Sequence, residues 1–204
     1  TLNVNGTGQV YLTPDLAYIN IGVNTQDVSA SAAVATNKEK SNAVIEAIKA
    51  AGVDPKDIHT TNFSIWSNPQ YDEQGQVKGT NYVVDNTVNV TVRNLDSLGD
   101  LLDSAVNAGA NNIYSIQFDV ANKDEATKEA RAKAVEDAKA QAQTLAETAG
   151  LTLVQIQTIN FYDNSPVPYF EGKGGGGAAE AAAVPIQPGQ LAISVTVNIT
   201  YTIK

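Results

Sequence analysis

Apolar and polar residues alternate along both ends of this chain. The alternation covers about residues 2–12 and 16–26 near the N-terminus, and about 191–203 near the C-terminus. A period of two is typical of strands that bury one face. Residues 13–15, Thr-Pro-Asp, predict a hairpin turn between the first two strands, because proline presets the turn dihedral and aspartate caps the turn. The two ends of the chain are therefore predicted to lie in one sheet.

The middle of the chain combines helical and strand periodicity. Helices are predicted over about 29–51, 98–109 and 123–149, and strands over about 58–66, 79–93, 116–120 and 152–161. The second helix has the spacing of a buried stripe, at Leu98, Leu101, Leu102, Ala105 and Val106. Between residues 15 and 120 the order is β-α-β-β-α-β, a split β-α-β unit. We therefore predict an α+β fold: a largely antiparallel sheet with three helices, with strands added to this unit at both termini.

No shift in composition marks a linker, so residues 1–204 are predicted to form a single domain. Two stretches interrupt the pattern of helices and strands. Residues 68–75 are predicted to form a loop. Residues 163–185 combine prolines with four consecutive glycines and a run of alanines, a composition that predicts a flexible excursion from the sheet.

The closing strand carries no charge between Gln190 and Ile203. Edge strands usually carry charges that block pairing with another chain. The strand is therefore either central in the sheet, or its edge or polar face meets another subunit. The long third helix has alanine at every fourth position from Ala126 to Ala142, so it either lies flat on the sheet or overhangs it toward a neighbour. We predict a homo-oligomer that forms through sheet edges or polar sheet faces.

Composition limits the possible partners and locations. The net charge is −9 and the pI is about 4.5, which argues against binding to nucleic acid or to an anionic membrane surface. The chain has no cysteine, which excludes disulfides and thiolate sites. It has no transmembrane segment, because no run approaches the roughly 20 apolar residues required. Since the chain has no methionine, we expect that Thr1 is not the natural start and that a signal segment has been removed. The absence of cysteine suits an extracytoplasmic setting.

Three features could carry chemistry, and none has the pattern that this chemistry requires. Gly6 and Gly8 precede a strand, whereas a dinucleotide site needs a third glycine and a helix; a kink or bulge in the strand is the better interpretation. His59 is the only histidine, and nothing in the sequence pairs it with a nucleophile. Asp72 and Glu73 lack the regular spacing of a calcium loop. We predict no catalytic, cofactor-binding or metal-binding residues and no cofactor.

A series of short landmarks runs in order along almost the whole chain. They are Gly6-x-Gly8, Pro14-Asp15, Ala51-Gly52-Val53, Asp57-Ile58-x-Thr60-x-Asn62-Phe63-Ser64-Ile65, Tyr71-Asp72, Val92-Arg93-Asn94-Leu95-Asp96, Ala108-Gly109-Ala110-Asn111 before Ile116-x-Phe118, Ala130-Arg131-x-x-Ala134-Val135-x-x-Ala138 and Ile186-x-Pro188-Gly189. In this order and spacing the chain resembles the SIMPL-domain family of bacterial oxidative-stress-defence and periplasmic immunogenic proteins. The resemblance implies an extracytoplasmic, self-assembling protein with a stress or envelope role, in a family not known for enzymes. Residues 163–185 depart from the shared pattern.

Three functions follow from these patterns. The first is a non-enzymatic, self-associating extracytoplasmic protein of the SIMPL type. The second is a binding module whose 163–185 segment, together with Tyr162, captures a protein or small ligand through aromatic and proline residues. The third is a hydrolase that uses carboxylates the sequence does not identify, which would require a pocket with paired carboxylates of shifted pKa.

Overall fold

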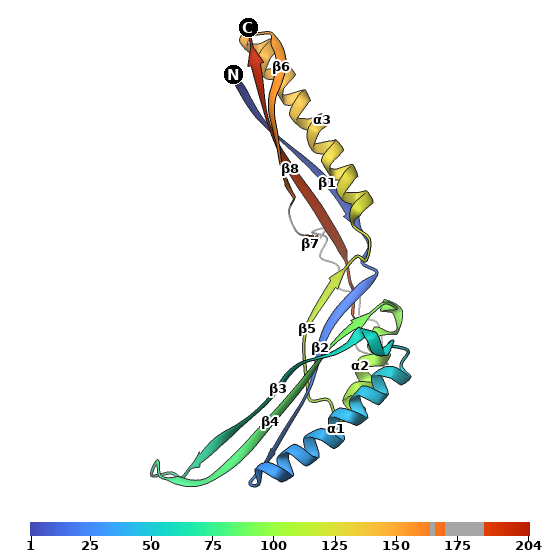
Figure 1. The fold of residues 1–204 in the computed structure, drawn as a ribbon, viewed down its shortest axis with the longest axis vertical. Coiled ribbons are helices and arrows are strands. Elements are labelled where there is room, and N and C mark those ends of the chain that lie inside the picture. Colours follow the sequence, from blue (N-terminus) through green and yellow to red (C-terminus); the bar gives the residue numbers. More distant parts are fainter. Residues whose placement is uncertain (164–165, 170–185) are drawn as a thin grey trace, which may run out of the picture. The chain divides into compact units, whose positions relative to one another are not determined.

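A computed structural model describes residues 1–163, 166–169 and 186–204. The chain divides into two compact units (Figure 1), which we describe separately. Of the described residues, the terminal unit comprises 1–14, 119–163, 166–169 and 188–204. The central unit comprises residues 15–118, 186 and 187.

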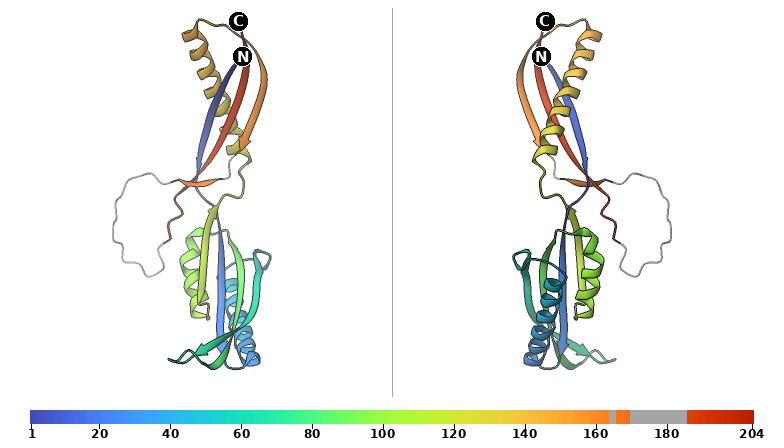
Figure 2. Two further views of the ribbon diagram at one scale, coloured as in Figure 1. Left: turned by 90° about the vertical axis from the view of Figure 1, so that its left-hand side faces the viewer. Right: turned by 90° about the vertical axis from the view of Figure 1, so that its right-hand side faces the viewer.

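The terminal unit is an antiparallel sheet covered on one face by one helix. The strands are β1 (Leu2–Leu12), β8 (Gln190–Ile203), β6 (Leu153–Asp163) and the short β7 (Val167–Tyr169). The strand order is β1-β8-β6, with β7 also paired to β8. The helix α3 (Asp124–Ala149) packs mainly on β1 and β8 (Figures 1 and 2). Its buried stripe of alanines meets the apolar face of these strands: Val4, Val10, Ile193, Val195, Val197 and Ile199.

Two glycines of β1 allow α3 to approach this closely. A Cβ atom added at Gly6 would lie 2.1 Å from the carbonyl oxygen of Ala134. One added at Gly8 would lie 1.9 Å from the carbonyl oxygen of Ala130. Both atoms belong to the helix backbone, so no side-chain rotation could relieve the overlap. The predicted bulge at these glycines is wrong, because β1 pairs with β8 without a register shift from Leu2 to Leu12.

The central unit has the predicted β-α-β-β-α-β order. It consists of β2 (Leu16–Asp27), α1 (Ala30–Ala50), β3 (Ile58–Tyr71), β4 (Val77–Val92), α2 (Leu98–Asn107) and β5 (Asn112–Asp119), with short 3-10 turns at Pro55–Asp57 and Leu95–Ser97. The strand order is β3-β4-β2-β5. Helix α1 packs on β2 and β4 and against α2 (Figure 2). The core lies between the helices and these strands, and Ile19, Ile21, Ile48, Val90 and Leu101 are among its residues.

The structure confirms the α+β class with three helices and corrects several finer predictions. The two termini share a sheet, but the strands form two sheets instead of one. Strand β8 is central, so β1 and β6 satisfy both of its edges and the argument from an unguarded edge does not apply to it. Val106 is 53% exposed, because the buried stripe of α2 ends at Ala105. The single domain over residues 1–204 stays a prediction, since two units with separate cores can still unfold in one transition.

The two predicted irregular stretches are partly regular. Half of the expected loop at 68–75 extends β3 to Tyr71, and the turn that begins at Asp72 remains. The Asp72 side chain accepts hydrogen bonds from the backbone N–H groups of Gln74 and Gln76. Within the expected 163–185 excursion, Val167–Tyr169 pair with β8 as β7. Residues 164–165 and 170–185, including the four glycines, lie outside the described residues.

Candidate functional site

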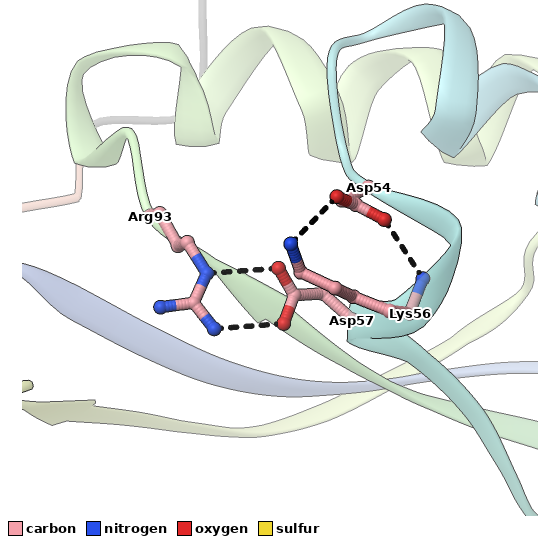
Figure 3. A network of polar contacts seen from close by, with 4 residues as sticks. All are labelled: Asp54, Lys56, Asp57 and Arg93. Atoms are coloured by element: carbon pink, nitrogen blue, oxygen red, sulfur yellow. Dashed lines mark hydrogen bonds and ion pairs between the residues drawn. The ribbon is translucent and has the colours of Figure 1, made fainter.

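The densest polar network of the central unit joins the start of β3 to the end of β4 (Figure 3). Arg93 donates from Nε to Asp57 Oδ2 at 2.8 Å and from a terminal nitrogen to Asp57 Oδ1 at 2.9 Å. Asp54 begins the 3-10 turn by accepting from the backbone N–H of Lys56 at 3.0 Å, and it also pairs with Lys56 Nζ at 2.8 Å. Two carboxylates and two cations therefore balance in charge.

A cavity of about 260 Å³ lies beside this network. Its lining includes Gly52 and Val53 after α1, Thr91 to Asn94 at the end of β4, and Leu101 of α2. The Arg93 hydrogen bonds lower the pKa of Asp57, and the Lys56 hydrogen bonds lower the pKa of Asp54. Both carboxyl groups therefore remain ionised at neutral pH and are unsuited to act as a general acid. We interpret the network as a clamp between two strand ends.

Acid should weaken this clamp. A carboxylate with a pKa lowered by folding contributes stability above its unfolded pKa, and that stability is lost as pH falls through the folded pKa. We therefore expect Asp57→Asn to lower the thermal midpoint at pH 7, with a difference from wild type that shrinks below about pH 4. Far-UV circular dichroism over a temperature ramp measures the midpoint at each pH.

Asp54→Asn is the matched control for this experiment. Its pair with Lys56 is on the surface, where ion pairs contribute little, so this variant should melt close to wild type. A midpoint difference for Asp57→Asn that stays constant from pH 7 to pH 2 would contradict an ionic clamp.

The candidate catalytic residues of the sequence do not come together. His59 is exposed and faces Asn89 across the β3–β4 pair, and among the described residues no serine or carboxylate hydrogen-bonds to it. Asp72 caps a hairpin turn at the far end of the same two strands. In the part of the chain that the structure describes, no group of three or more histidine and carboxylate side chains could hold a metal ion. The absence of catalytic and metal sites in the whole chain stays a prediction.

The terminal unit has one guarded and one open sheet edge. On the outer edge of β1, the Thr7 N–H donates to Asp137 Oδ2 of α3 at 2.8 Å, and Lys133 Nζ donates to the Gln9 carbonyl oxygen at 3.5 Å. The hydrogen bond from the Thr7 N–H lowers the pKa of Asp137. Strand β6 is the opposite end of the sheet, and the described strands place no neighbour along its outer edge. Among the described residues, the free hydrogen-bonding edge of this sheet is therefore that of β6.

Three apolar side chains of β6 are left uncovered by α3. Ile156, Ile159 and Phe161 pair with Tyr201, Ile199 and Val197 of β8, whose side chains form the helix-covered face. Directly opposite residues point to the same face, so the three side chains point to the side on which α3 lies. They are nevertheless 39%, 43% and 44% exposed. Helix α3 lies mainly on β1 and β8 and makes few contacts with β6, among them the Arg131–Asp163 ion pair.

Sequence reasoning did not find this surface. Alternation over 152–161 predicts a strand with a buried face, and it does not reveal whether a helix is wide enough to cover that face. The available signal was the alanine stripe of α3, since alanines bury little area and hold the helix close to only two strands.

The sequence model of SIMPL, described as a protein of unknown function (DUF541), matches residues 2–201. The chain belongs to the SIMPL family. This match spans both structural units, and its range includes the clamp residues Asp57 and Arg93.

Three relatives show how far the similarity extends. The chain is 32% identical to the 26 kDa periplasmic immunogenic protein of Brucella melitensis, over 98% of this chain and 84% of that protein. It is 31% identical to the uncharacterized protein YggE of Edwardsiella ictaluri, over 78% of this chain and 66% of the relative. It is 33% identical to the uncharacterized protein YggE of Escherichia coli, over 80% of this chain and 66% of that protein.

Among the described residues, no helix is both long and apolar enough to cross a membrane.

Proposed function

We propose that this SIMPL protein is non-enzymatic, works outside the cytoplasm in an envelope or stress role, and associates with copies of itself along the outer edge of β6. The observation that carries the self-association is the open edge of β6 with apolar side chains beside it. The location is supported by the periplasmic name of the Brucella relative. The envelope or stress role rests on family resemblance.

The geometry of β6 suits pairing with a second β6. Two register shifts interrupt its pairing with β8 before Thr158, and the run from Thr158 to Asp163 is regular. Strands related by a two-fold axis would exchange N–H and C=O groups over this run, which is an isologous contact. Ile159 and Phe161 of each copy would then lie beside those of the other. Asp163 is the only acidic or basic residue of β6, and it is already paired with Arg131.

The non-enzymatic part of the proposal rests on the state of the polar groups. The carboxylates Asp54, Asp57 and Asp163 are each paired with a cation, and each has a lowered pKa. His59 follows Asp57 by two residues, but it is exposed and faces Asn89, and no described carboxylate hydrogen-bonds to it. A hydrolase using paired carboxylates would need two of these groups with pKa values pushed apart.

A lysine on the open edge should block self-association. We expect wild type to sediment as a dimer or larger species at micromolar concentration, and Ile159→Lys to associate at least about ten-fold more weakly. The side chain of Ile159 is already exposed, so the fold should survive, while two lysines would face each other across the interface. Sedimentation velocity over a concentration series measures both.

Asn3→Lys is the control, because it places the same charge on the guarded strand β1. It should associate as wild type does. A wild type that remains monomeric at high micromolar concentration would refute self-association. Equal effects of the two lysines would refute the choice of β6.

The alternative of a binding module using residues 163–185 has one specific observation in its favour. Tyr169 of β7 lies against Tyr11 of β1, with ring centroids 4.4 Å apart. The described end of that segment therefore contributes to a surface of the terminal unit.

A further inference from the structure

The face of the terminal sheet opposite α3 is polar and has no charge. Every second residue of β1 from Asn3 to Tyr11, and of β8 from Gln190 to Thr202, points to this face. The β1–β8 pairing runs through eleven consecutive residue pairs without a shift, which makes a platform about 35 Å long. Helix α3 lies on the other side of the strands (Figure 2). We call this surface the polar face.

Amide side chains form a row across the middle of the polar face. Asn5, Asn198 and Asn160 face one another on three neighbouring strands. Asn198 Nδ2 donates to Asn5 Oδ1 at 2.8 Å. Threonine, serine and glutamine occupy most of the remaining positions on β1 and β8. Amide and hydroxyl groups both donate and accept hydrogen bonds, so the polar face suits a ligand whose own groups do both.

Three tyrosines add ring surfaces to the polar face. Tyr11 and Tyr169 form a tilted pair at one end, and the Tyr11 hydroxyl donates to Gln9 at 3.1 Å. Tyr162 of β6 pairs with Thr196 of β8 and is 61% exposed. A tyrosine offers an apolar ring with a polar end, which matches a sugar ring with its C–H faces and outer hydroxyls.

Charge and polarity argue against nucleic acid, apolar surfaces and anionic ligands as occupants. The absence of lysine and arginine from the polar face, in a chain of net charge −9, disfavours phosphates and nucleic acid. A lipid surface or a second apolar sheet would bury the amides of this face without offering them hydrogen-bond partners, which costs free energy. An anionic ligand would have no cationic side chain to pair with on this face. A neutral ligand rich in hydroxyl groups matches the donors and acceptors of the polar face, and the length of the platform favours a chain over a monosaccharide.

We propose that the polar face binds an extended, uncharged polysaccharide. The tyrosine rings stack on the sugar rings, and the asparagine row hydrogen-bonds the hydroxyl or acetamido groups. This inference goes beyond the proposed self-association and uses a different surface, since the β6 edge is not required for the contacts of β1 and β8.

Isothermal titration of the full chain with cellohexaose and with chitohexaose tests the proposal. These probes separate a neutral glucan from an N-acetylglucosamine chain. We expect at least one hexasaccharide to bind, its monosaccharide to bind much more weakly, and polygalacturonate, which is anionic, not to bind. Asn198→Asp should weaken binding at least about ten-fold, because it removes an amide donor and adds a charge to the row. Tyr11→Ala should weaken it as well, and this variant provides a second test if Asn198→Asp fails to fold.

Asn89→Asp is the matched control. Asn89 lies on the central strand β4 of the other sheet and hydrogen-bonds Asn20 there, as Asn198 does with Asn5. The Asn89→Asp protein should bind the hexasaccharides as wild type does. Binding of neither hexasaccharide at millimolar concentration would overturn the proposal, as would equal binding by wild type, Asn198→Asp and Tyr11→Ala. Sedimentation of the same variants should match wild type, so a failure here is distinguishable from a failure of self-association.

Discussion

Gly8→Ala should strongly destabilise the terminal unit, although it adds a single methyl group. The new Cβ would lie 1.9 Å from the carbonyl oxygen of Ala130 and 2.6 Å from the backbone nitrogen of Ala134. Relief requires α3 to lift from β1, which also breaks the Thr7–Asp137 hydrogen bond. Overpacking against movable side chains costs about 1–3 kcal/mol, and a rigid helix backbone should bring the loss to the top of this range or above it.

The measurement is hydrogen exchange of the α3 amides together with the thermal midpoint. We expect α3 to lose its protection and the midpoint to fall by about 10 °C or more. Thr7→Ala is the control, because Thr7 is exposed and its backbone N–H still reaches Asp137. A Gly8→Ala protein that melts with wild type would show that α3 does not pack on β1 as described.

Leu101→Asp should unfold the central unit. Leu101 is 1% exposed in the core between α2 and the sheet. A buried, unpaired carboxylate costs several kcal/mol, which is comparable to the total stability of a typical domain of about 5–15 kcal/mol. The amides of α1 and α2 should lose their protection from hydrogen exchange, and the cooperative melting transition of the central unit should disappear.

Val106→Asp is a strict control for this variant, because it places the same charge on the same helix. Val106 is 53% exposed, so the variant should melt near wild type. Comparable losses in the two proteins would mean that the faces of α2 are assigned wrongly. Exchange of the α3 amides in Leu101→Asp also tests the prediction of a single domain: one cooperative domain loses α3 protection as well, whereas independent units keep it.

Local periodicity predicted much of the fold. The alternation at both ends and the helical stripe around Leu101 depend on neighbours within one element, so the strands and helices could be predicted from the chain itself. The β-α-β-β-α-β order followed from them. Which strands share a sheet depends on contacts between distant segments, and alternation shows only that one face is buried. The sequence pattern therefore predicted a single sheet, whereas β2 to β5 form a second sheet.

The features of the candidate surfaces depend on such distant contacts. Gly6 and Gly8 resemble a strand irregularity until the backbone of α3, more than a hundred residues away, is placed against them. Asp57 and Arg93 each stood out as landmarks, but their pairing across 36 residues gave no sequence signal. The open edge of β6 was least predictable, because it exists only where a narrow helix fails to cover a third strand.

Cysteine scanning of β6 tests the central claim of self-association most directly. The chain has no cysteine, so single cysteines at positions 158 to 162 report only contacts between copies. Around a two-fold axis perpendicular to the sheet, one residue faces its own copy at a Cα separation of about 4.5–5.5 Å, within the range of a disulfide. We predict a disulfide-linked dimer from at least one of these variants under oxidising conditions, and none from Thr7→Cys on the guarded strand β1. Failure of all five β6 positions to cross-link, or equal cross-linking by Thr7→Cys, would contradict the account.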